Sequence, residues 1–137
     1  MTRAPVTHEK VADRYGEIAR GGGTCCGAAT DPGTLEHAEH IGYSADDLAA
    51  LPEGANLGLG CGNPTSLTMI QEGDVVVDLG SGAGIDCFLA ARHAGDGGRV
   101  IGVDMTDDML DKARAYASES GDTGWVEDQV VSTVAQK

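Results

Sequence analysis

Aromatic residues, lysine and long apolar segments are all scarce in this 137-residue chain. One Trp, one Phe and three Tyr leave the core to Val, Leu, Ile and Ala. No apolar run approaches the roughly 20 residues that a membrane-spanning helix needs. The first ten residues also lack the apolar segment of a secretory signal. We therefore expect a cytoplasmic protein that does not bind a membrane.

Positive charge is also in short supply. Asp and Glu total 22 against 9 Lys and Arg, which gives a formal net charge of −13. Nucleic acids and anionic membranes are bound through a basic surface, so both are excluded as partners. A dense carboxylate surface is typical of adaptation to high salt, where screening removes its self-repulsion. We favour that interpretation over an ordinary acidic protein.

The 21 glycines lie mainly between apolar segments, where they indicate turns and tight loops. In the first half, Val11, Tyr15 and Ile18 form a helical stripe within residues 7–20. Shorter helices are predicted over 34–41, over 44–51 with Ser44 as N-cap, and from Asn63 to about Ile70. Residues 24–33 and 52–63 are predicted loops.

The second half alternates strands with helices. Val75–Leu79 is a β-branched run suited to a parallel strand that is buried on both faces. A glycine loop at 80–84, a helix over 85–94 and a second strand over 99–104 follow. Thr106 is the predicted cap of a further helix. This order predicts an α/β fold containing a right-handed βαβ unit.

A glycine loop between a strand and a helix is typical of nucleotide-type sites, because the backbone can approach a ligand closely. Asp104 lies 20 residues beyond Gly84, at the end of the next strand, where it suits two ribose hydroxyls. The alternative is a tight turn that binds nothing, with Asp104 merely capping a helix.

The four cysteines are expected to be thiols, because a cytoplasmic protein seldom forms disulfides. Cys25 and Cys26 are adjacent in one loop, and Cys61 lies in a second glycine-rich loop. Thiolates select soft ions, so these loops are candidate sites for a metal or metalloid. Cys87 is interpreted as a small buried residue on a core-facing helix. His37 and His40 share a helix face, but two ligands do not make a zinc site.

The block Asp78-Leu79-Gly80-Ser81-Gly82-Ala83-Gly84 resembles the first motif of class I S-adenosylmethionine-dependent methyltransferases. The resemblance implies a Rossmann-like fold and S-adenosylmethionine as cofactor. It implies that Asp78 faces the cationic methionine end, that Asp104 holds the ribose hydroxyls and that Met105 lies against the adenine. The cofactor-binding residues implied in this way are Asp78, Gly80, Ser81, Gly82, Gly84, Asp104 and Met105.

A wider set of segments resembles the N-terminal half of microbial arsenite methyltransferases. These segments are 21–26, 52–64, 78–87 and 102–106, and the similarity runs over about residues 7–119. The resemblance implies methyl transfer to thiol-bound trivalent arsenic, with Cys61, Cys25 and Cys26 as arsenic ligands and a thiol reductant as a partner. Which of the adjacent pair is the ligand stays open.

No such resemblance continues beyond Ser120. We therefore expect a truncated chain with an incomplete fold: an N-terminal helical and cysteine-loop extension (1–70), a partial cofactor-binding domain (71–120) and an unmatched tail (121–137). It would pair with a missing C-terminal half or self-associate, since a two-stranded sheet leaves edges and faces uncovered. Two alternatives to an arsenite methyltransferase remain. One is a non-catalytic thiol module that binds arsenite or another soft ion, and the other is a different small-molecule methyltransferase.

Overall fold

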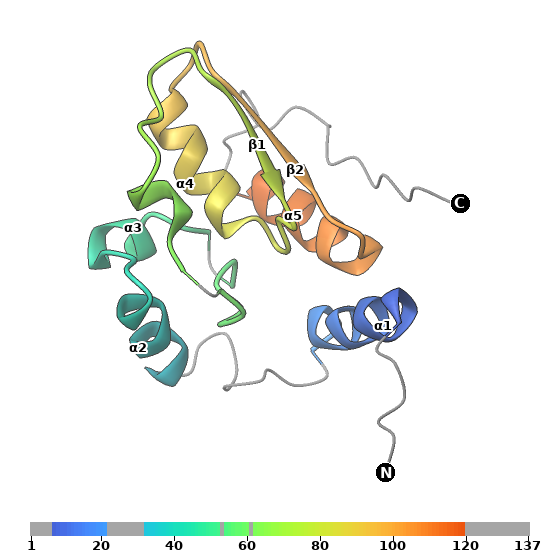
Figure 1. Cartoon of the computed structure of the whole chain (residues 1–137). Coiled ribbons are helices and arrows are strands. Elements are labelled where there is room, and N and C mark those ends of the chain that lie inside the picture. The colour runs from blue at the N-terminus through green and yellow to red at the C-terminus, as the bar shows by residue number, and fades with distance from the viewer. Residues whose placement is uncertain (1–6, 22–31, 53, 61, 120–137) are drawn as a thin grey trace.

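The structure, a computed structural model, describes residues 7–21, 32–52, 54–60 and 62–119. The described part of the chain begins with helices and continues with alternating strands and helices (Figure 1). In order they are α1 (His8–Ala19), α2 (Pro32–His40), α3 (Ala45–Ala49), the 3₁₀ turn η1 (Pro64–Ser66), β1 (Val75–Leu79), α4 (Ile85–Ala94), β2 (Arg99–Val103) and α5 (Asp107–Glu119). None of the helices in these ranges is long and apolar enough to cross a membrane.

The two strands form the predicted parallel pair. Val75 lies opposite Arg99 and Leu79 lies opposite Val103. Helix α4 connects the strands and packs against both of them, which gives the βαβ unit its hydrophobic contact (Figure 1). Ala90 and Ala91 of α4 meet Val100 of β2 in one buried cluster, with Val76 of β1 against it. The α/β expectation is confirmed, and the arrangement is that of a Rossmann-like fold.

The prediction that β1 is buried on both faces is wrong for the described residues. Val75, Val77 and Leu79 are 67%, 55% and 80% exposed, whereas Val76 and Asp78 between them are partly buried. Side chains alternate between the two faces of a strand, and α4 covers one face of this sheet. The other face has no described helix packed on it, as a sheet of only two strands was expected to show.

Two of the described N-terminal helices begin at a residue whose side chain caps them. The Lys10 amide donates to Thr7 Oγ1 at 3.4 Å at the start of α1. Ser44 and Asp47 form a capping box at the start of α3, which confirms Ser44 as N-cap. Helix α1 packs on α5, where Ile18 and Ala19 join Leu57, Ala83 and Met109 in a buried cluster.

Two other predictions at helix starts are wrong. Asn63 caps a single 3₁₀ turn and not a helix to Ile70, because Leu67 and Met69 are 87% and 89% exposed and have little to pack on. Thr106 precedes α5, but its buried Oγ1 has no hydrogen-bond partner. The Thr106 amide donates to Asp104 Oδ1 at 2.8 Å and the Thr106 carbonyl oxygen accepts from the Leu110 amide at 3.1 Å, so Thr106 stands at the start of α5 without a side-chain cap.

Candidate functional site

The glycine loop leaves open space in front of its backbone. Gly80 and Gly82 have φ of +79° and +55°, in the left-handed region that favours glycine. A Cβ added at either position would meet no described atom within 4 Å. The loop therefore combines a backbone that needs glycine with room for a ligand against its amides.

Asp104 links this loop to the helix after β2. Its Oδ2 accepts from the Gly82 amide at 2.9 Å, and its Oδ1 accepts from the Thr106 amide at 2.8 Å. Each carboxylate oxygen has two acceptor positions, so both oxygens retain one for a ligand. The hydrogen bonds from these two backbone amides fix the orientation of the Asp104 carboxylate. A site for a pair of hydroxyl groups requires such a fixed carboxylate.

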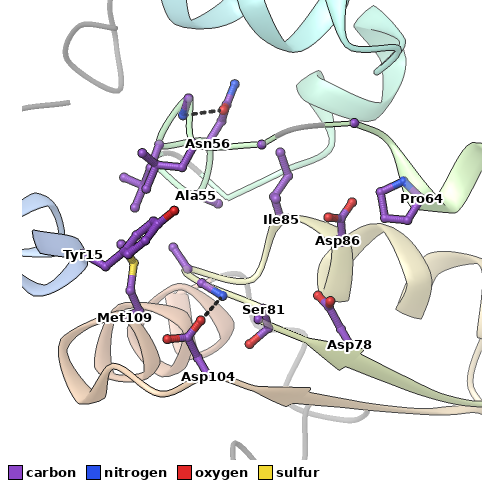
Figure 2. Close-up of a pocket in the computed structure, with 18 of the residues that line it drawn as sticks. Tyr15, Ala55, Asn56, Pro64, Asp78, Ser81, Ile85, Asp86, Asp104 and Met109 are labelled. Atoms are coloured by element: carbon purple, nitrogen blue, oxygen red, sulfur yellow. Dashed lines mark hydrogen bonds between the residues drawn. The ribbon is translucent and has the colours of Figure 1, made fainter. Parts of the chain in front are cut away.

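An open pocket of about 990 Å³ lies above the loop. Small-molecule sites span roughly 300–1,000 Å³, so this volume is at the upper end of that range. Figure 2 shows Tyr15 and Met109 at one end, Asp78 and Asp86 at the other, and Asp104 and Ser81 between them. Six of the seven predicted cofactor residues line the pocket: Asp78, Gly80, Ser81, Gly82, Asp104 and Met105. Gly84 does not: it is buried, and a Cβ there would come within 3.1 Å of Phe88 Cε2 and 3.5 Å of Ala113 Cβ.

Two carboxylates give one end of the pocket a negative charge. Burial raises the pKa of Asp78, and the neighbouring Asp104 raises it further, while a hydrogen bond from Cys87 lowers it. Burial also raises the pKa of Asp86, with a smaller contribution from Asp78 and an opposing hydrogen bond from Tyr43. The described residues that line the pocket include no Lys or Arg. This end therefore suits a cationic group.

Tyr43 joins this acidic end to the 54–63 segment. Its hydroxyl lies 2.8 Å from Asp86 Oδ1 on α4 and 3.1 Å from the Gly62 carbonyl oxygen. Burial and the Asp86 carboxylate raise the pKa of Tyr43, so the phenol keeps its proton at neutral pH. Neither Tyr43 nor Asp86 was predicted from the sequence as a site residue. The only signal was the position of Asp86 two residues beyond Gly84, at the start of a helix that follows the glycine loop.

Further contacts hold both sides of position 61. His37 Nε2 lies 3.2 Å from the Gly60 carbonyl oxygen, so the tautomer with a proton on Nε2 donates there. Asn63 Nδ2 donates to the Gly42 carbonyl oxygen at 3.0 Å. The flanks of the second glycine-rich loop are thus bonded to α2 and to the turn that follows it.

The predicted arsenic thiols Cys25, Cys26 and Cys61 lie outside the described residues, and their role stays a prediction. Within the described ranges, no three His, Cys, Asp or Glu side chains are grouped so as to hold a metal ion. His37 and His40 accordingly form no such site in this part of the chain.

Cys87 lies on the core-facing side of α4 as predicted, but it is only partly buried and it also makes a polar contact. It lies against the cluster of Ala90, Ala91 and Val100 on the core side of α4. Its Sγ donates to Asp78 Oδ2 at 3.4 Å. Burial and the neighbouring carboxylate raise the pKa of Cys87, so this residue is a protonated thiol and not a nucleophile at neutral pH.

Parts of the chain are similar in sequence to known proteins. Residues 70–125 match the family described as a methyltransferase domain. The arsenite methyltransferase of Halobacterium salinarum is 48% identical over 125 residues, which cover 83% of this chain and 32% of that protein. The arsenite methyltransferase of Aquipseudomonas alcaligenes is 32% identical over 114 residues, which cover 80% of this chain and 30% of that protein.

A solved structure is also similar. The arsenic(III) S-adenosylmethionine methyltransferase from Chlamydomonas reinhardtii aligns with 29% identity and a TM-score of 0.43, over 74% of this chain and 31% of that one. The chain thus spans about a third of the length of the curated relatives that it matches. Over that length the chain is similar in sequence to the arsenite methyltransferases, and its second half is similar to a methyltransferase domain.

Proposed function

We propose that this chain binds S-adenosylmethionine in the pocket above the glycine loop and serves methyl transfer to thiol-bound trivalent arsenic. The observation that carries the proposal is the order of groups along the pocket. A fixed carboxylate (Asp104), an open glycine backbone (Gly80 and Gly82) and a carboxylate without a basic neighbour in the lining (Asp78) follow one another. That order matches a ligand with ribose hydroxyls at its centre and a cationic amino-acid end.

The residues present fit this cofactor. The space in front of Gly80 and Gly82, which a Cβ would fill, lets the ligand approach the loop amides. Asp104 would accept from the ribose hydroxyls, Met105 would lie against the adenine, and Asp78 would face the cationic end. The bound cofactor supplies an electrophilic methyl group on a sulfonium.

The thiol-bearing loops would place the arsenic. Cys61 and the Cys25/Cys26 pair are the proposed ligands, because thiolates bind soft trivalent arsenic. In-line attack by the arsenic lone pair requires alignment more than a general base, so holding both partners in one pocket is the main contribution of the protein. The hydrogen bonds at Gly60 and Asn63 support this role, since they fix the backbone on both sides of position 61. A thiol reductant would keep these cysteines reduced.

We further propose that residues 1–70 supply the thiols and 71–120 the cofactor loop, with no role assigned to 121–137. One face of the sheet is covered by no described helix. This exposed face supports association with a missing C-terminal half or with a second copy of the chain.

Titration with S-adenosylmethionine tests the cofactor proposal. We expect saturable binding that the Asp104→Asn variant weakens roughly tenfold, because the charged acceptor of two hydroxyls is lost. Asp96→Asn, in the exposed turn before β2, is the matched control and should bind like the unmodified protein. Equal affinity of the Asp104 variant would contradict the role of Asp104, and absent binding to the unmodified chain would contradict the proposed function.

Arsenite titration in the presence of a reductant tests the thiol proposal. Cys61→Ser should weaken arsenite binding at least several-fold, because one of the soft ligands is lost. Cys87→Ser should leave it unchanged, since the Cys87 thiol is protonated and packed against the α4 core. Arsenite binding without cofactor binding would favour the non-catalytic thiol module. Cofactor binding without arsenite binding would favour a different small-molecule methyltransferase.

A further inference from the structure

The apolar stripe of α1 divides between the core and the pocket. Ile18 is 6% exposed and packs with Leu57 and Met109. Tyr15 and Val11, one and two turns earlier, line the pocket, and Tyr15 is 40% exposed. A large aromatic side chain in a pocket wall with two-fifths of its surface free offers an unused face for a ligand.

Close packing between α1 and α5 fixes the place of this tyrosine. Arg20, just after α1, forms an ion pair with Asp108 in the first turn of α5. Gly16 lies beside this pair, where a Cβ would come within 2.8 Å of Asp108 Oδ2 and 3.1 Å of Arg20 Nη1. A glycine at this position leaves room for the ion pair that joins α1 to α5.

The position of Tyr15 along the pocket identifies the ligand part that it would meet. It lies beside Met109, at the end opposite Asp78 and Asp86, with Asp104 between the two ends (Figure 2). A nucleoside whose ribose lies at Asp104 and whose cationic end lies at Asp78 extends its base toward Tyr15. Met109, 1% exposed, gives that end an apolar floor.

We propose that Tyr15 stacks on the adenine of the cofactor and forms a wall of the base site. The inference rests on the proposed function, because it takes S-adenosylmethionine as the ligand. A tyrosine ring presents a flat apolar face with few rotatable bonds, and stacking on a base needs no hydrogen-bond match. The ring, not the hydroxyl, then provides the affinity.

Titration of Tyr15 variants with two ligands tests this assignment. Tyr15→Ala should weaken S-adenosylmethionine and adenosine by the same factor, roughly tenfold, because both ligands carry adenine. Tyr15→Phe should bind both as the unmodified protein does. Asp13→Ala, an exposed change on the same helix that does not touch the pocket, is the control.

Two results would overturn the proposal: unchanged affinity in Tyr15→Ala, or a Phe variant as weak as the Ala variant, which would assign the effect to the hydroxyl. Tyr15→Leu guards against a loss of folding, since it keeps an apolar side chain on α1, and it should bind more weakly than Tyr15→Phe. Failure of the unmodified chain to bind S-adenosylmethionine refutes the proposed function as well. Normal binding by both the unmodified chain and Tyr15→Ala refutes the role of Tyr15 alone.

Discussion

Asp86 is held half-buried between α4 and the Tyr43 hydroxyl, and its ionisation is linked to the stability of the fold. Burial raises the pKa of Asp86 above the ordinary 3.8. At a pH between the ordinary and the raised value, the folded protein keeps a proton on Asp86 that the unfolded chain has lost. The free energy of unfolding therefore falls as pH rises through this range. The pKa of Asp78 is raised as well, so Asp78 adds to this loss of stability with rising pH.

Asp86→Asn should remove part of this pH dependence. Asn does not ionise, yet its side-chain oxygen still accepts from Tyr43. The melting temperature of the variant minus that of the unmodified protein should therefore increase as pH is raised from near 3.8 to neutrality. Asp96→Asn should show no such gain. Melting curves of Asp86→Asn and the unmodified protein that stay parallel over this range would contradict the assignment.

Residues whose roles follow from local spacing were predictable from the sequence, whereas those that distant segments bring together were not. The glycines of the loop and Asp104 follow a strand–loop–helix–strand order, so their shared pocket was predictable. Tyr43 and Asp86 are 43 positions apart, and no periodicity links a phenol to a carboxylate. Tyr15 was identified only as part of a helical stripe, because a helical pattern does not separate a core face from a pocket wall.

At the scale of elements, the contact between β2 and the glycine loop leaves no room at Gly102. A Cβ there would come within 2.8 Å of Ser81 Oγ and 2.9 Å of Cys87 Sγ. Ser81 belongs to the loop and Cys87 to α4, so β2 sets the distance between the sheet and both elements that follow β1. The glycine loop therefore keeps its shape only if position 102 has no side chain.

Gly102→Ala should destabilise the protein by about 1–3 kcal/mol, the usual cost of overpacking. Gly97→Ala is its control, since a Cβ at Gly97 would meet the Gly73 Cα at 3.8 Å, an ordinary contact. Denaturant unfolding of the two variants measures the difference. A Gly102 variant as stable as the Gly97 variant would show that loop and strand are not closely packed.

Helix and strand types were predictable, while lengths depended on tertiary contacts. Helix α4 begins and ends where the glycines at 84 and 95 indicated. The predicted helix after Asn63 contracts to one turn, because its apolar residues Leu67 and Met69 have little to pack against in the described structure. The prediction that β1 is buried on both faces was wrong for a related reason. Helix α4 covers one face of the described sheet, and no described helix covers the other.

Over the whole molecule, the net charge of −13 is poorly compensated. The ion pairs in the described ranges join partly exposed side chains, which contribute little to stability. Repulsion among the remaining carboxylates is long-ranged at low ionic strength and weakens as the Debye length falls to about 3 Å at 1 M salt.

Melting temperature should therefore rise between low and molar KCl. The expected cause is screening, so the rise should be steepest at the lowest salt concentrations, where the Debye length changes most. Thermal unfolding followed by circular dichroism over a KCl series provides the measurement. A melting temperature independent of KCl would contradict adaptation to high salt.

The Tyr43 hydroxyl has one proton and two acceptors within reach. An ionised carboxylate is a stronger acceptor than a neutral carbonyl, so the Tyr43 hydroxyl donates chiefly to Asp86 and only weakly to the Gly62 carbonyl oxygen. That carbonyl oxygen belongs to a residue that lines the pocket, next to position 61. A ligand that carries hydroxyl groups, such as arsenite in its neutral As(OH)₃ form, could donate to it without breaking the bond between Tyr43 and Asp86.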